Sequence, residues 1–101
     1  MKILALEQPG PNPDEDYSGL LQAEARRAWE LRQEDILREA YFSANEHEAV
    51  LVLECRDVAH AREVLASLPL VKAGIIDFRL VPLVPYDGFA RLFNPVPPAA
   101  L

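Results

Sequence analysis

The stretch ILREAYFSANEHEAVLVLEC, from Ile36 to Cys55, decides the fold of this chain of 101 residues. Two runs rich in β-branched and aromatic residues flank a polar tip, Asn45–Glu48, whose residues favour turns. The pattern predicts a β-hairpin with this tip.

The register of the hairpin decides which side chains share a face of the sheet. With this tip, Tyr41 lies opposite Val52 and Glu39 lies opposite Glu54, and side chains alternate between the two faces. One face is small and apolar and suits packing of helices: Ala40, Phe42, Ala44, Ala49, Leu51, Leu53 and Cys55, with Arg38 at its end. The other mixes polar groups with valines, which is typical of a lined cavity or a partly polar interface: Leu37, Glu39, Tyr41, Ser43, Val50, Val52 and Glu54.

The residues before the hairpin predict a strand, a loop and a helix. The apolar run Lys2–Glu7 indicates a strand, and the proline-rich segment after it indicates a loop. The main helix is expected from about Ser18 to about Glu34. One stripe of this helix holds Leu21, Ala25, Ala28 and Arg32, and Trp29 beside it is expected in the core. Its charged set is expected to be solvated: Glu24, Arg26, Arg27, Glu30 and Gln33.

A second helix and a last strand follow the hairpin. Asp57 is a typical N-cap residue, and Pro69 is expected to end the helix. Its apolar stripe is Val58, Ala61, Leu65 and Leu68. Gly74 opens the last strand, in which Ile76, Phe78 and Leu80 alternate with Ile75, Asp77, Arg79 and Val81. Pro82 and Pro85 favour an edge position in the sheet.

Composition narrows the function classes. The net charge of −6 argues against nucleic acid and anionic membrane surfaces. Cys55 is the one cysteine, so no intrachain disulfide is expected, and the strand pattern places it among buried residues. No signal peptide or membrane span is evident, and we expect a cytoplasmic protein.

The order strand, helix, strand, strand, helix, strand predicts a ferredoxin-like α+β fold, βαββαβ, with a four-stranded antiparallel sheet. We expect one domain over residues 1–93 and a loose Pro-rich tail over residues 94–101. The domain includes a docked apolar segment that carries Phe89, Leu92 and Phe93 and packs either on its own domain or on a partner subunit. Helices cover only one face of such a sheet. The valines and isoleucine of the other face predict a partner: Val50, Val52, Ile75 and Val81.

Three segments carry a family resemblance: REAYF at Arg38–Phe42, AVLVLEC at Ala49–Cys55 and LASLPLVKAGIIDFRLVPL at Leu65–Leu83. With these segments the chain resembles the muconolactone isomerase-like and YCII-like branch of the dimeric α/β-barrel proteins. The resemblance implies a homodimer in which two sheets face each other around a barrel. YCII-type proteins are associated with a His–Asp pair, which His47 at the tip and His60 on a helix do not match.

The candidate chemistry lies on the mixed face. Carboxylates in an apolar barrel have raised pKa values and suit general acid–base catalysis. We expect Glu39, Glu54 and Tyr41 to be catalytic, with Tyr41 bonded to a substrate oxygen, and Asp77, Arg79, Val52 and Ser43 to bind substrate, with Glu7 as a further candidate. These groups would equally serve as structural ion pairs. No metal or cofactor is expected.

Two functions remain open. The first is a small-molecule isomerase or lyase that moves a proton next to a carbonyl without a cofactor, as the resemblance to muconolactone isomerase implies. The second is a non-catalytic dimeric barrel that binds a small hydrophobic ligand or acts as an accessory subunit. The predicted register also implies that Glu39 and Glu54 titrate as a coupled pair, with at least one pKa raised.

Overall fold

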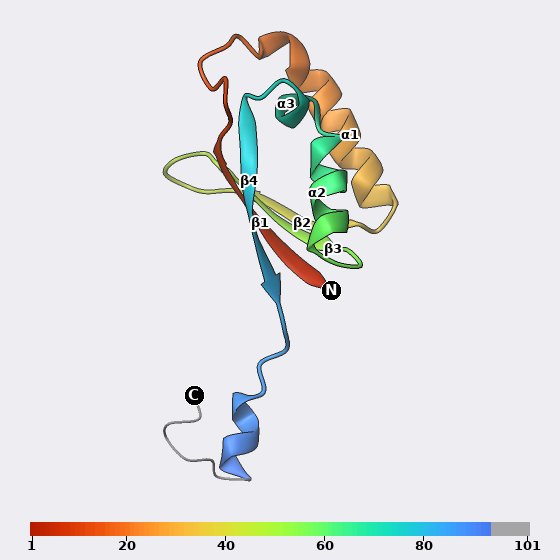
Figure 1. Ribbon diagram of the computed structural model, residues 1–101, viewed down its shortest axis with the longest axis vertical. Helices are drawn as coiled ribbons and strands as arrows, with labels where there is room; N and C mark the ends of the chain where they lie inside the picture. Colours follow the sequence, from red (N-terminus) through yellow and green to blue (C-terminus); the bar gives the residue numbers. More distant parts are fainter. Residues whose placement is uncertain (94–101) are drawn as a thin grey trace.

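The strands and main helices follow the predicted order in the computed structural model, which describes residues 1–93 (Figure 1). The strands are β1 (Lys2–Pro9), β2 (Leu37–Phe42), β3 (Ala49–Glu54) and β4 (Ile76–Leu83). The helices are α1 (Leu21–Gln33), α2 (Val58–Ala66) and α3 (Pro69–Lys72), with short 3-10 helices η1 (Ser18–Leu20) and η2 (Gly88–Leu92). The tail predicted at residues 94–101 lies outside the described residues.

The sheet has the order β2-β3-β1-β4, and all neighbouring strands are antiparallel. This confirms the ferredoxin-like α+β fold and the edge position of β4. Ile3 and Ala5 of β1 are fully buried because both neighbours of this strand are paired with it and the helices cover this face. Figure 1 shows α1, α2 and α3 on the same side of the sheet.

The hairpin exists, but its predicted register is wrong. Phe42 pairs with Ala49 and Glu39 pairs with Val52, so Glu39 does not lie opposite Glu54. The loop closes one residue earlier than expected, because the amide of Glu48 donates to the Ser43 hydroxyl at 3.0 Å. From Glu39 to Phe42 the shift moves each partner by two positions, an even number, and therefore leaves these side chains on their predicted faces.

A β-bulge corrects a second part of the prediction. The register shifts between Leu37 and Glu39, which leaves Arg38 as an extra residue in β2. Leu37 therefore turns to the helix-covered face, where it is buried, instead of the mixed face. Arg38 is exposed, and its guanidinium donates to the carbonyl of Asp35 at 2.6 Å.

The helices begin and end for identifiable reasons. The Asp57 carboxylate accepts the amide of His60 at 2.8 Å, which confirms the predicted N-cap of α2. Pro69 does not end this helix, because α2 already stops at Ala66. Pro69 is instead the first residue of α3, a position at which a helix does not need the backbone N–H that proline lacks. Trp29 was expected in the core, but 62% of it is exposed on the outer side of α1.

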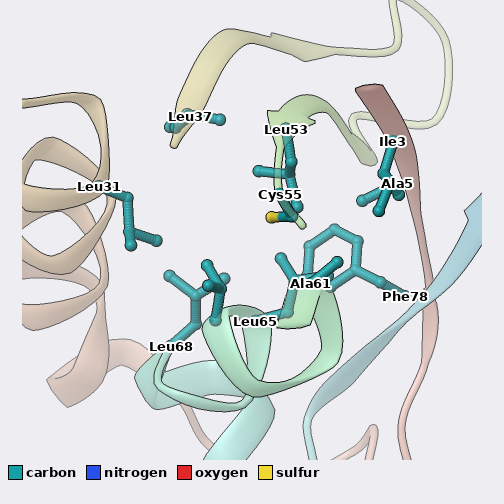
Figure 2. Packing of buried hydrophobic residues seen from close by; sticks show 11 residues of the cluster. Ile3, Ala5, Leu31, Leu37, Leu53, Cys55, Ala61, Leu65, Leu68 and Phe78 are labelled. Atoms are coloured by element: carbon teal, nitrogen blue, oxygen red, sulfur yellow. The ribbon is translucent and has the colours of Figure 1, made fainter. Parts of the chain in front are cut away.

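The core lies between the sheet and the helices (Figure 2). Leu31 is the one buried residue of α1, and it points toward Leu68 and the strands. Cys55 is buried in this cluster, as predicted, and burial raises the pKa of its thiol. The remaining labelled members come from every strand and from α2: Ile3, Ala5, Leu37, Leu53, Ala61, Leu65 and Phe78.

The second face of the sheet has no helix on it within residues 1–93 (Figure 1). We call it the open face. It carries half-exposed apolar side chains from three strands: Leu4, Leu6, Val50, Val52 and Val81. Ile75 was expected there but is buried just before β4, where its carbonyl accepts the amide of Gly10.

The segment after β4 leaves the body of the molecule. Figure 1 shows residues 84–93, which include η2, standing away from the sheet and helices, and the molecule extends over 56 Å. Phe89 is 69% exposed and Leu92 is 77% exposed. We call residues 84–93 the arm. The arm stands away from its own domain, so its docking on a partner subunit, the other expected surface, stays a prediction.

Candidate functional site

An apolar pocket of about 400 Å³ lies between α1 and the sheet. It forms because α1 and the strands beneath it present small residues, among them Ala25, Ala28, Ala40 and Ala49. Such short side chains do not fill the space between the helix and the sheet. The rest of the lining is mainly leucine and aromatic: Leu21, Leu31, Leu37, Tyr41, Phe42, Leu51, Leu53, Leu65, Leu68, Leu70, Ile76 and Phe78.

Glu24 brings a carboxylate to the wall of this pocket. The amide of Leu70 donates to its Oε1 at 2.9 Å, so the side chain is tied to the segment that begins α3. Desolvation raises the pKa of Glu24, the hydrogen bond from Leu70 opposes this rise, and the nearby negative charge of Glu7 adds to it. The expectation that Glu24 is solvated is wrong.

Glu7 supplies a second carboxylate to the same pocket. It lies on the helix-covered side of β1, since it follows Ala5 by two residues, and not on the open face as expected. The amide of Ala49 at the start of β3 donates to its Oε1 at 3.0 Å. This bond holds the Glu7 carboxylate at the point where the pairing of β1 with β3 ends.

A second hollow of about 430 Å³ adjoins the pocket. The two spaces share the wall residues Glu7, Leu21, Phe42, Leu70 and Ile76, so they lie next to each other. The second hollow adds more polar residues, among them Tyr17, His47 and Glu48. We call these two neighbouring spaces together the elongated site, of which the first space is the apolar end and the second is the more polar end.

The hairpin tip places His47 at the polar end. Its imidazole stacks on the ring of Phe42 with 3.9 Å between centroids and 17° between planes. The backbone of His47 has a φ of 55°, in the left-handed region, which turns the chain back toward β3. His47 is exposed at the tip and also lines the second hollow.

Of the three predicted catalytic residues, Glu39 and Tyr41 are bonded to each other and Glu54 lies apart from them. The Tyr41 hydroxyl donates to Glu39 Oε1 at 2.6 Å, and this bond raises the pKa of Tyr41. Glu54 lies opposite Lys2, and its Oε2 accepts the amino group of Met1 at 2.6 Å, which lowers the pKa of Glu54. The expected pairing of Glu39 with Glu54 is absent, and Glu54 is not the member of the pair with the raised pKa that the prediction required.

The predicted substrate-binding residues are also dispersed. Asp77 and Arg79 face Gln8 and Leu6 across the β1–β4 pair, on the open face. Val52 lies on the same face in β3, and Ser43 closes the hairpin loop. Of the predicted site residues, Tyr41 and the further candidate Glu7 line the pocket on the other side of the sheet.

One sequence signal could have located the missed carboxylate. Glu24 precedes Leu31 by seven residues, two turns of helix, so the two share one stripe of α1. An acid in line with the buried residue of a helix indicates an unusual environment. The hairpin tip carries no comparable signal for His47, because its position depends on the loop conformation.

Residues 1–93 contain neither a cluster of metal-ligating side chains nor a membrane-spanning helix. Within residues 1–93, no group of three or more His, Cys, Asp or Glu side chains is arranged to hold a metal. No helix in this part of the chain has the length and apolar character needed to cross a bilayer.

Comparisons with known proteins support the fold. No protein-family model and no curated protein sequence match the chain. Among solved structures, a crystal structure of muconolactone isomerase is similar, with a TM-score of 0.71 and 20% identity. The match covers 86% of this chain and 92% of that chain. At this identity the likeness establishes a shared fold, the muconolactone isomerase-like form of the ferredoxin-like arrangement.

Proposed function

We propose that the protein is a small-molecule isomerase or lyase that moves a proton next to a carbonyl group without a cofactor, with the pocket between α1 and the sheet as its active site. The observation that carries the proposal is the Glu24 carboxylate, held on an apolar wall with its pKa raised by desolvation. The fold shared with muconolactone isomerase agrees with it.

Glu24 would act as the base and then as the acid. Desolvation makes its carboxylate a better proton acceptor toward a carbon next to a carbonyl. The protonated carboxyl would then return the proton to a different carbon of the conjugated system, so that a double bond moves and the atoms balance. The Leu70 amide would hold Glu24 in place during both steps.

The open face supports a second location for this chemistry. The bonded pair Glu39 and Tyr41 would line a barrel interior if a second copy of the chain covered the half-exposed valines of this face. In that dimer, Glu54, Asp77, Arg79, Val52 and Ser43 would be the remaining candidate lining residues. We propose the homodimer on the same grounds, because Val50 and Val52 have no helix to cover them.

A ligand-binding function without catalysis is the alternative. The predominantly apolar lining of the pocket suits a small hydrophobic ligand whether or not a reaction follows. In that case Glu24 would orient the ligand by a hydrogen bond and no proton would move between carbons.

Isomerisation of α-angelica lactone, a neutral β,γ-unsaturated lactone, to its conjugated isomer distinguishes these proposals. We expect wild-type protein to accelerate the reaction, Glu24→Gln to lose at least about 100-fold in rate, and Glu39→Gln to retain it. Glu63→Gln, an exposed acid on α2, is the matched control. Loss of rate in Glu39→Gln alone would move the reaction to the barrel. Absence of any acceleration, for this lactone and for 3-cyclohexenone, would contradict the enzyme and favour ligand binding.

A further inference from the structure

Among residues 1–93, the side chains that line the two neighbouring hollows include acidic residues and no arginine or lysine. Among residues 1–93, the charged residues that line them are Glu7, Glu24 and Glu48, and His47 is the one ionisable nitrogen. The sign of the charge is therefore the same along the whole elongated site.

This negative charge is not neutralised by ion pairs. The salt bridges within residues 1–93 join Met1 to Glu54 and Arg27 to Glu30 and Glu34, all outside the site. Glu7 and Glu24 accept hydrogen bonds from backbone amides, which fix their positions without supplying a full positive charge.

The nearest helix cation is already engaged. Arg27 follows Glu24 by one turn of α1, but its Nε donates to the Ser67 hydroxyl at 2.8 Å and its Nη1 to Glu30 at 3.3 Å. It is absent from the residues that line either hollow. A ligand anion in the pocket would therefore meet carboxylates across a surface of low polarity, where repulsion is stronger than in water.

We infer that this site selects against anions: its ligand is a neutral or cationic molecule with an apolar body beneath α1 and a polar, hydrogen-bond-donating group toward Glu7, Glu48 and His47. The inference rests on the proposed function, because it takes the pocket as the ligand site. It adds the charge class of the ligand, which sets this pocket apart from one built to bind a carboxylate or a phosphate with arginine or lysine.

Two fluorescent probes that share one body test the inference. N-phenyl-1-naphthylamine is neutral, and 8-anilino-1-naphthalenesulfonate is the same body with a sulfonate. We expect the neutral probe to bind more tightly, so that the Kd of the sulfonate probe divided by the Kd of the neutral probe is greater than one. We expect Glu24→Gln and Glu7→Gln each to lower this ratio by about tenfold, because each variant removes one repelling charge. Glu63→Gln makes the same change of net charge on an exposed site and should leave the ratio within about twofold, because solvent and salt screen it.

The outcomes separate this inference from the proposed function. If both probes bind but the ratio is unchanged in Glu24→Gln and Glu7→Gln, the charge selection is wrong and the pocket remains. Ala28→Phe adds a ring at the pocket wall and should abolish binding of the neutral probe while the circular dichroism spectrum stays native. Unchanged binding in Ala28→Phe, or no binding to the wild type, would overturn both the inference and the pocket as a ligand site.

Discussion

Glu24 shows how the environment of one residue changes its chemistry. On a solvated helix face it would be an ordinary acid, yet it lines an apolar pocket and its pKa is raised. The folded state therefore binds the proton of Glu24 more tightly than the unfolded chain does. Stability attributable to this group is present at pH values below its ordinary pKa of 4.5 and is lost as the pH rises through the raised pKa.

Glu24→Gln should remove this pH dependence. Glutamine keeps an oxygen to accept the Leu70 amide but carries no charge. We expect the variant to melt a few degrees above the wild type at pH 7, with the difference disappearing near pH 4. Thermal unfolding followed by circular dichroism across this range measures it, with Glu63→Gln as the exposed control. Equal melting temperatures at both pH values would contradict the burial of the charge.

Gly10 and Gly74 are required where β1 meets the entry to β4. A Cβ on Gly10 would overlap the carbonyl oxygen of Gly74, and Gly74 has a φ of +76°, which disfavours other residues. The carbonyl of Gly74 also accepts the amide of Asn12 at 2.7 Å. The close contact between Gly10 and Gly74 positions Ile75 and Ile76 at the wall of the second hollow.

Gly74→Ala should therefore lower the free energy of unfolding by about 1–2 kcal/mol. The matched control is Gly19→Ala, which would meet no atom within 4 Å and should change stability by less than about 0.5 kcal/mol. Urea denaturation compares the two. Equal stability of both variants would show that the backbone near Gly74 adjusts without strain.

At the scale of the element, α1 is held by few interactions because the pocket lies beneath it. Leu31 is its one buried side chain, and Glu24 and Arg27 attach it through Leu70 and Ser67. A helix with little buried surface opens locally more often than the strands beneath it.

We expect the amides of α1 to exchange hydrogen faster than those of β1, and binding of N-phenyl-1-naphthylamine to slow the exchange in α1. The reason is that a ligand in the pocket adds apolar contacts to the underside of the helix. Hydrogen–deuterium exchange read by mass spectrometry on peptides of α1 and β1 measures this. Protection of β1 with no change in α1 would contradict a ligand beneath the helix.

The hairpin shows which parts of the fold were predictable. Its two strands, the order of the elements and the cap at Asp57 follow from local patterns, and the structure has all of them. The register depended on the Ser43 side chain and on the bulge at Arg38, which are details of loop and strand geometry without a clear sequence pattern. The predicted opposition of Glu39 and Glu54 failed with the register, whereas a role of these residues in a site stays a prediction.

The candidate pocket was harder to predict than the sheet. It requires α1, the end of β1 and the start of α3 to meet, and those distances come from tertiary packing. The small residues Ala25, Ala28, Ala40 and Ala49 look like close packing in a sequence, whereas in the structure they leave a space.

At the scale of the whole molecule, the open face and the arm both present apolar surface. The arm carries Phe89 and Leu92, and the ring of Tyr86 packs edge-on against Phe89 with 4.9 Å between centroids. A 3-10 helix of five residues does not form stably alone in water. We therefore expect the arm to pack on a second copy of the chain.

Removal of the arm tests this expectation. We expect the full chain to be a dimer at micromolar concentration, with an interface on the order of 1,600 Å², and the chain ending at Val84 to dissociate more readily. Light scattering over a range of concentrations measures both. Phe89→Ser in the full chain is a milder variant that should weaken the dimer in the same direction. A full chain that stays monomeric would refute the dimer, and an unchanged dimer after truncation would refute the role of the arm.

The position of Trp29 has a consequence for spectroscopy. It is the one tryptophan of the chain, and it is largely exposed on the outer side of α1, away from the core. Its emission in the native protein should already resemble that of indole in water, so unfolding should shift the spectrum very little. A blue shift that grows with protein concentration would instead report that another molecule covers the outer side of α1. The fluorescence of Trp29 is therefore better suited to detect association with another molecule than to follow unfolding.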